Sequence, residues 1–525
     1  MTKVIKYLLI TIAFILLLIF VISVYIKKQA LEKLTAIEGI SCKNLDINLF
    51  TGCLELESLG ITRPLGDTKT EKVKLFTNTA YLHGLSYWQY WKNNRINFDN
   101  LIIGDLVIEI SPNDTMNVKV DTTQQAGEST IEEISIDHID LQKGKFALKN
   151  ADFKAINLDS FVAKIEKFQF FTKRDSQQIV WKKVAFSGQQ FLLDGQKSDN
   201  QLLVDKIALT NEKTMKLQDF RWKPKYSKTN YLNPYQYTKA RIDAHIPSIE
   251  LRQFPLDDLI FQQQFKAQSI TTQNGILKIY SDRNKPQCTD CPKNYHYEGL
   301  IASELRLDID SISIKNSTIF LEELGEGKTK AGHLDWSKVY ASIYNLTNNQ
   351  TKSKSHPNTV ADIQAVFVDE GNVELHFEFP NFNKNGDYTF HGGLDKVDLK
   401  EINTFLVFSK QFRIKQGKVT SFAFEGSGNS QSASGDMELR YKNLELELLK
   451  RDRSSRTFLS KVVNVLIGKE NNPDEEKGIR KGKMYFERDK NKSFIGNWWR
   501  TLQTGIQSTM LPNILLPDEL DVKTN

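Results

Sequence analysis

The chain has 525 residues, of which 40% are hydrophobic and 26% are charged, with 13 Pro and only 4 Cys. These proportions exclude an intrinsically disordered chain, a collagen-like fibre and a disulfide-stapled mini-protein. The 70 Lys and Arg residues nearly balance the 64 Asp and Glu residues, so the net charge of +6 gives no reason to expect nucleic acid as a partner.

Residues 7–26 give the strongest signal in the sequence, because all twenty are uncharged. A helix of this length spans about 30 Å, the thickness of the bilayer hydrocarbon core. Lysines flank the run on both sides, and no small-residue cleavage site of a signal peptide follows it. We therefore expect residues 1–28 to be an uncleaved, single-pass transmembrane anchor. The flanking charges do not fix its orientation, but the architecture favours a cytoplasmic N-terminus and an exported remainder.

Beyond the anchor, the dominant pattern is alternation of apolar and polar residues. Val373, Leu375 and Phe377 alternate with Glu374 and His376, which is typical of half-buried strands with one apolar face. The sequence therefore predicts a mainly β fold: an elongated, repetitive antiparallel sheet forming a groove, with a few short helices.

The strands recur in a unit made of an alternating run, a one-residue slip, a second run, a Gly or Asn turn and a further strand. Copies of this unit occupy residues 96–110, 134–150, 265–281, 305–321 and 412–426. A slip such as the one at Asp310-Ser311 indicates a bulge or bend. An offset of 169 residues superposes the first copy on the third, together with the short apolar segments before them, so we expect internal repetition over residues 29–440.

Residues 441–525 form the third predicted region, with basic character, closing strands and amphipathic helices. Residues 440–500 carry 16 basic and 9 acidic side chains. Apolar residues at helical spacing predict one helix over residues 458–467 and a longer one over residues 494–510. Two interpretations remain open: these helices close the end of the sheet, or Trp498 and Trp499 lie at a membrane interface.

The four cysteines give two expectations. A hairpin turn at Thr51-Gly52 would hold Cys42 and Cys53 too far apart for a disulfide. Cys288 and Cys291 stand in a CxxC sequence between two prolines, where either a local disulfide in a loop or two free thiols is expected.

Catalytic motifs do not emerge from the sequence. None of the eight His residues forms an HExxH or similar ligand pair, and the residues before Gly327-Lys328 lack the first Gly of a phosphate-binding loop. We therefore expect neither an enzyme nor a cofactor or metal site. The apolar side of the strands remains as the candidate site, either closed as a sandwich core or open as a trough. Its expected lining comprises Leu54, Leu56, Ile108, Ile110, Ile134, Ile136, Leu277, Ile279, Leu307, Ile309, Val373, Leu375, Phe377, Leu444 and Leu446.

Several phrases together resemble a known family. They are the strand pair LDINLFTGCLELESLGITRP, the segments HGLSYWQYWKNNRINFDNLIIGDLVIEI and IELRQFPLDDLIFQQQFKAQSITTQNGILKIYSD, and the C-terminal KGKMYFERDKNKSFIGNWWRTLQTGIQSTM. With the N-terminal anchor, they resemble the AsmA-like proteins of diderm bacteria, relatives of TamB, in the form found in Bacteroidota. The resemblance implies a protein anchored in the inner membrane, with most of the chain periplasmic and a β-groove that carries phospholipid.

Two hypotheses follow from these observations. In the first, the protein binds phospholipid in the groove and supports lipid transport and outer-membrane homeostasis. In the second, it is a non-enzymatic scaffold or assembly factor for outer-membrane protein biogenesis, with an outer-membrane or periplasmic protein as its partner.

Overall fold

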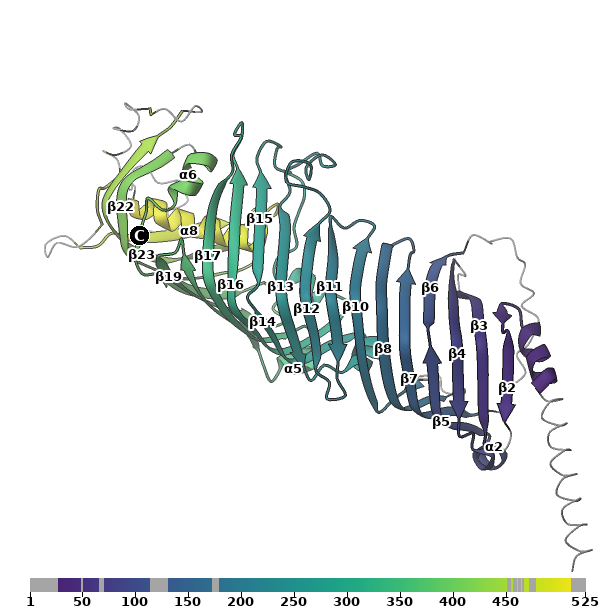
Figure 1. Ribbon diagram of the computed structural model, residues 1–525. Helices are drawn as coiled ribbons and strands as arrows, with labels where there is room; N and C mark the ends of the chain where they lie inside the picture. Colours follow the sequence, from purple (N-terminus) through teal and green to yellow (C-terminus); the bar gives the residue numbers. More distant parts are fainter. Residues whose placement is uncertain are drawn as a thin grey trace, which may run out of the picture. The chain divides into compact units, whose positions relative to one another are not determined.

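The computed structural model describes residues 27–48, 51–65, 70–113, 131–171, 179–410, 412–450, 455–456, 460, 464, 467–471 and 478–510. Within these residues the protein is mainly β, as predicted (Figure 1). Its contacts divide the chain into unit 1, residues 1–218, and unit 2, residues 219–525. The expected transmembrane segment, residues 7–26, lies outside the described residues. No helix among the described residues is both long and apolar enough to cross a membrane.

Unit 1 is built around one sheet with a short helix at one end. Residues 27–36 are helical, and α2 (Tyr87–Asn93) precedes the fifth strand. The strands are β1 (Ile40–Ser41), β2 (Asn44–Asn48), β3 (Cys53–Leu65), β4 (Glu71–His83), β5 (Arg95–Gly104), β6 (Leu106–Pro112), β7 (Glu133–Leu148), β8 (Phe153–Phe171), β9 (Ile179–Val180), β10 (Lys183–Gly195) and β11 (Asn200–Leu209). A further strand, β12 (Met215–Pro224), spans the boundary between the units.

Most strand pairs of unit 1 are antiparallel, but β5 and β6 break this pattern. Both strands pair antiparallel with β4 on one side and parallel with β7 on the other. They are therefore two halves of one long strand, interrupted at Asp105, whose φ of 51° is left-handed. The sheet continues through β8 and β10 to β11.

Unit 2 begins with the same arrangement. Here α3 (Leu256–Gln262) follows β13 (Arg241–Arg252), and β14 (Gln264–Gln273) and β15 (Ile276–Asp282) both pair antiparallel with β13 and parallel with β16 (Arg306–Leu324). The offset of 169 residues relates α2 to α3, and it also relates Asp105 to Asn274, whose φ is 54°. The repetition inferred from apolar spacing thus recurs in strand pairing and backbone conformation.

The slips in the sequence correspond to irregularities inside long strands. In the pairing of β16 with β17 (Gly332–Thr347), Asp310 is unpaired opposite Asn345, whose φ is 58°, and the register shifts between Ile314 and Ser317. The predicted Gly or Asn turn followed by a new strand is wrong for the copies in β7, β16 and β22, where one strand continues past the irregularity, because a bulge bends a strand without reversing it. In the first and third copies a new strand does follow, β6 after β5 and β15 after β14, and it pairs with the same neighbouring strands as the one before it.

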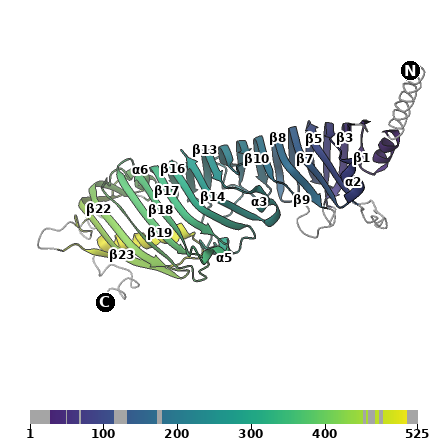
Figure 2. The same cartoon turned by 90° about the horizontal axis from the view of Figure 1, so that it is seen from below.

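The rest of unit 2 is an antiparallel succession of neighbouring strands. It comprises β18 (Asn358–Phe367), β19 (Gly371–Pro380), β20 (Tyr388–Leu394), β21 (Val397–Asp398), β22 (Phe412–Gly428), β23 (Ser432–Leu448) and β24 (Lys481–Glu487). The helices are α4 (Glu298–Ile301), α5 (Gln350–Ser353), α6 (Asn403–Ser409) and α8 (Phe494–Met510). Seen from below, β18, β19 and β23 lie in front of α8, which covers the opposite face of this sheet (Figure 2).

The C-terminal helix confirms one prediction and leaves another open. The helix expected over residues 494–510 is α8. Of the helix expected over residues 458–467, the structure describes only Ser460, Asn464 and Ile467, the first two in helical conformation. The division into regions 1–28, 29–440 and 441–525 stays a prediction.

The N-terminal hairpin differs from its predicted register. Asn48 pairs with Cys53, so four residues separate the paired positions, and the predicted two-residue turn at Thr51-Gly52 is wrong. The shift is two residues, which leaves each side chain on its expected face. Cys42 and Cys53 are both free, as expected.

Candidate binding site on the apolar face of the sheet

The registers of unit 1 align apolar side chains into continuous rows across the strands. Residues directly opposite each other on neighbouring strands lie on the same face of a sheet. One row contains, in order, Ile61, Leu75, Ile108, Phe146, Leu158, Phe191 and Val204, from β3, β4, β6, β7, β8, β10 and β11. A second row contains Leu56, Ala80, Ile103, Leu141, Ala163, Phe186 and Leu209. We call these two rows the apolar face of unit 1.

Much of this apolar face is only partly covered. In the first row, Leu158 and Val204 are buried, whereas the other five residues keep intermediate exposure. The fully buried cluster here consists of Leu106, Leu158 and Phe161, with partly buried neighbours around it. The helix α2 packs near β5 but has no buried residue of its own. The apolar face of unit 1 therefore presents hydrocarbon side chains that the described residues leave accessible.

The corresponding rows of unit 2 end beneath α8. One row contains Leu251, Ile270, Ile312, Ile343, Ala361, Phe377 and Phe390. Towards β24 the face is covered by Trp498 and Leu502 of α8, which join Phe377, Phe390 and Phe424 in one buried cluster. The face is thus closed at this end of unit 2, where the helix supplies the second layer.

The helix α8 also covers the edge of the sheet. The Lys483 backbone N–H donates to Ser508 Oγ at 2.8 Å, and the Tyr485 N–H donates to Thr504 Oγ1 at 3.0 Å. Four residues of a helix span about 6.0 Å along its axis, and two residues of a strand span about 6.6 Å. Helix side chains four residues apart can therefore reach the N–H groups of every second residue of a neighbouring strand. These bonds satisfy backbone groups of β24 that would otherwise form an open edge.

A second edge is satisfied in the same way. The Leu446 N–H donates to Asn464 Oδ1 at 2.7 Å, and the Leu448 N–H donates to Ser460 Oγ at 2.9 Å. Ser460 and Asn464 again stand four residues apart. These bonds, together with those from α8 to β24, support the interpretation that the C-terminal helices close the end of the sheet.

The other end of this covered region is held by α6. Val407 of α6 is buried, and Leu406 packs against the same cluster as Trp498. Next to α6, Glu323 of β16 accepts from Lys410 Nζ at 2.6 Å and from Arg283 Nη2 at 2.7 Å. Burial alone would raise the pKa of Glu323, but these two cations outweigh it and lower the pKa. The carboxylate therefore stays charged and ties α6 to β16.

The two predicted interface tryptophans have different surroundings. Trp498 is only 9% exposed and packs against Phe377 and Phe424, whereas Trp499 is 49% exposed. Trp498 thus has almost no surface to offer to a membrane, so its burial favours the interpretation that the helix closes the sheet. The surroundings differ because the two neighbours point to different sides of the helix.

The segment before α8 is bound by the loop that contains Cys288 and Cys291. The structure contains the Cys288–Cys291 disulfide. The Cys291 N–H donates to Asn491 Oδ1 at 2.8 Å, and the Lys293 N–H donates to the Lys490 carbonyl at 2.8 Å. Close by, the Arg488 guanidinium lies 4.3 Å from the centre of the Tyr295 ring. The loop therefore positions the start of α8.

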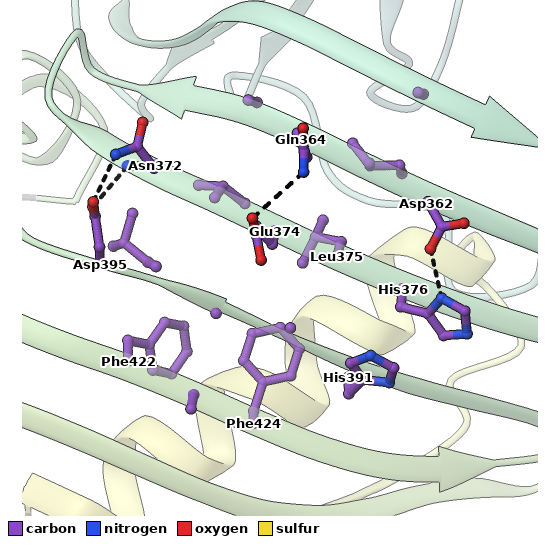
Figure 3. Close-up of a pocket in the computed structure, with 18 of the residues that line it drawn as sticks. Asp362, Gln364, Asn372, Glu374, Leu375, His376, His391, Asp395, Phe422 and Phe424 are labelled. Atoms are coloured by element: carbon purple, nitrogen blue, oxygen red, sulfur yellow. Dashed lines mark hydrogen bonds and ion pairs between the residues drawn. The ribbon is translucent and has the colours of Figure 1, made fainter. Parts of the chain in front are cut away.

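The unit 2 sheet also carries a hollow of about 1550 Å³ that is lined by both polar and apolar side chains, including Leu375 and Phe424. Figure 3 shows polar side chains from neighbouring strands around it, including Asp362, Glu374, His376 and His391. His376 Nδ1 lies 2.7 Å from Asp362 Oδ1, and the rings of His376 and His391 stack with centroids 4.5 Å apart. No group of three metal-ligating side chains suited to an ion occurs among the described residues. The polar side chains around the hollow therefore offer hydrogen-bonding groups.

The sequence-predicted lining residues fall in both units, and each is described. Ile108 and Ile110 pair with Leu75 and Val73, and Leu54 pairs with Leu82. The remaining positions also lie on strands, and the residues with which they pair across the sheet are apolar or small. Four of these positions are buried: Ile136, Ile309, Phe377 and Leu444. Their role in holding a ligand stays a prediction.

Sequence reasoning left out several residues that complete the rows, among them Phe146, Leu158, Phe191 and Val204. The alternation in β7, β8, β10 and β11 could have identified them. No protein-family model and no curated protein matches this chain.

Proposed function

We propose that this chain binds the acyl chains of phospholipid along the apolar face of unit 1, as an AsmA-like protein anchored in the inner membrane with its sheet in the periplasm. In this proposal, it supports lipid transport and outer-membrane homeostasis without catalysis. The observation that carries the proposal is the pair of apolar rows, each crossing seven strands, with many members still accessible.

The dimensions of the rows agree with an acyl chain as ligand. Six spacings of about 4.8 Å give a row of roughly 29 Å, close to the bilayer hydrocarbon thickness of about 30 Å. A chain from one leaflet needs about half that length. Apolar surface of this extent is unfavourable in water, so a hydrocarbon ligand would stabilise it.

The test uses two adjacent residues on opposite faces of β6. Benzoylphenylalanine is placed at Ile108, which belongs to the apolar face, or at Val107, the matched control on the other face, in the full chain in cells. After irradiation, we expect phospholipid adducts at position 108 by mass spectrometry and none at position 107. Equal phospholipid adducts at both positions would contradict binding along the apolar face. A protein adduct at position 108 instead of lipid would favour the scaffold hypothesis.

A further inference from the structure

The short helix α2 presents an unusual number of aromatic side chains to solvent. Tyr87, Trp88, Tyr90 and Trp91 are 47%, 64%, 52% and 84% exposed. Large aromatic side chains gain most when they leave water, so four of them together on seven residues mark an interaction surface. We call these four residues the aromatic face of α2.

The fold itself does not require this aromatic face. The helix α3 occupies the equivalent place in the repeat, between β13 and β14, and its sequence LDDLIFQ contains a single aromatic residue. Of its large apolar residues, only Ile260 is strongly exposed, and Asp257 and Asp258 stand in its first turn. The helix at this place in the repeat can thus form with acidic residues, so the fold does not need the aromatic residues of α2.

The chemistry of α2 suits a bilayer surface. Trp and Tyr concentrate at the membrane–water interface, where one end of the ring system meets hydrocarbon and the other meets headgroups. The helix has no acidic residue in its first turn, and Lys92 Nζ lies 5.6 Å from the centre of the Trp88 ring. A lysine beside the aromatic residues adds attraction to anionic headgroups.

The position of α2 agrees with this chemistry. Lys27 Nζ forms an ion pair with Asp46 of β2 at 3.1 Å, two residues before the β2–β3 turn. At the same turn, the Gly52 carbonyl accepts from the Leu85 N–H at 3.1 Å, just before α2. The first described residue and the aromatic face thus lie at one end of the β2–β3 pair. Lys27 directly follows the uncharged residues 7–26, which we expect to span a bilayer.

We propose that the aromatic face of α2 inserts into the surface of the bilayer that residues 7–26 span. It holds this end of unit 1 against the headgroups. The proposal concerns attachment and does not require lipid on the apolar face, so it stands or falls separately from the proposed function.

The experiment measures quenching of tryptophan fluorescence. The full chain is reconstituted into vesicles of phosphatidylcholine and phosphatidylglycerol, in which the phosphatidylcholine is brominated near the headgroup end of its acyl chains. The test variant is Trp88→Phe/Trp91→Phe, which retains apolar rings but removes both indoles. The matched control is Trp499→Phe, which removes an exposed indole outside α2.

We expect brominated lipid to quench the wild-type protein, the control variant to retain this quenching, and the double variant to lose at least half of it. Phospholipid crosslinking at Ile108 should not change in the double variant. Absence of quenching in the wild type, or equal quenching in the double variant, would overturn the proposal and assign the aromatic face to a protein partner.

Discussion

Trp498 of α8 meets Phe377 of β19 edge to face, with ring centroids 5.2 Å apart. The sequence left open whether Trp498 lies at a membrane interface or closes the sheet, and whether the apolar side that contains Phe377 is an open trough or a closed core. In the structure both residues belong to one buried core. At this contact, α8 covers the apolar side of the unit 2 sheet. Ligand binding is therefore better sought in unit 1 than beneath α8.

Replacing Phe377 by alanine should destabilise unit 2 strongly. Phe377 is 5% exposed and touches Trp498, so its removal leaves a cavity and costs about 3–5 kcal/mol of unfolding free energy. Denaturant unfolding monitored by tryptophan fluorescence measures this loss. The control is Glu374→Ala on the exposed side of the same strand, where we expect a change within about 0.5 kcal/mol. Equal effects of the two substitutions would contradict the burial of Phe377.

Replacing Ser508 by alanine should open the edge of β24. The Lys483 N–H loses its acceptor and is left in a partly buried place, which costs roughly 1–3 kcal/mol. We expect faster hydrogen exchange of the Lys483 amide, measured by mass spectrometry of peptides that cover β24. The control is Gln507→Ala, an exposed neighbour on α8. Unchanged exchange in the Ser508 variant would show that the helix does not protect this edge.

Replacing Gln263 by glycine should stabilise the protein. Gln263 ends α3 with a φ of 51°, and a residue with a side chain loses roughly 1 kcal/mol in this left-handed conformation. We expect a gain of about 0.5–1 kcal/mol in chemical denaturation. Asn94, the equivalent residue after α2, should gain less from the same change because asparagine tolerates this conformation. As the control, Gln262→Gly inside α3 should lower the free energy of unfolding by about 1 kcal/mol. A loss of stability in the Gln263 variant as well would contradict the left-handed conformation of Gln263.

His296 should make the protein less stable as the pH falls from 6.5 towards 4. Burial, followed by repulsion from Arg488, lowers the pKa of His296 from 6.5 to about 4, against the opposing effect of Glu298. Between these values the unfolded chain binds a proton that the folded chain does not, so unfolding is favoured as acid is added. Above pH 6.5 this contribution to stability is fully present.

The measurement is the denaturation midpoint at several values of pH between 4 and 7. The variant His296→Phe keeps a ring among Phe379 and Phe494 but cannot bind a proton, so we expect a smaller loss of stability on acidification than in the wild type. The control is His356→Phe, which removes a histidine from an exposed site. If the denaturation midpoints of the wild type and the His296 variant fell equally with pH, His296 would not be a source of the acid sensitivity.

Local patterns were sufficient to predict much of the fold. Alternation at Val373, Leu375 and Phe377 identified a strand and its apolar side, because side chains of a strand point alternately to two faces. Helical spacing from Phe494 to Met510 identified α8, and the offset of 169 residues identified the repeat. These features depend on residues close in sequence or on a recurring period, so the sequence by itself determined them.

Other features depend on which distant segments meet. The parallel pairing of β5 and β6 with β7, and the continuation of β16 past Asn316, follow from neighbouring strands rather than from local composition. The burial of Trp498 beside the exposed Trp499 was decided by the sheet against which α8 packs, since both residues have the same chemistry and adjacent positions. Only the tertiary structure could decide which part of the apolar side of the sheet is covered by the protein's own helices. Such coverage depends on contacts between distant residues, for example Phe377 and Trp498, which are more than a hundred positions apart.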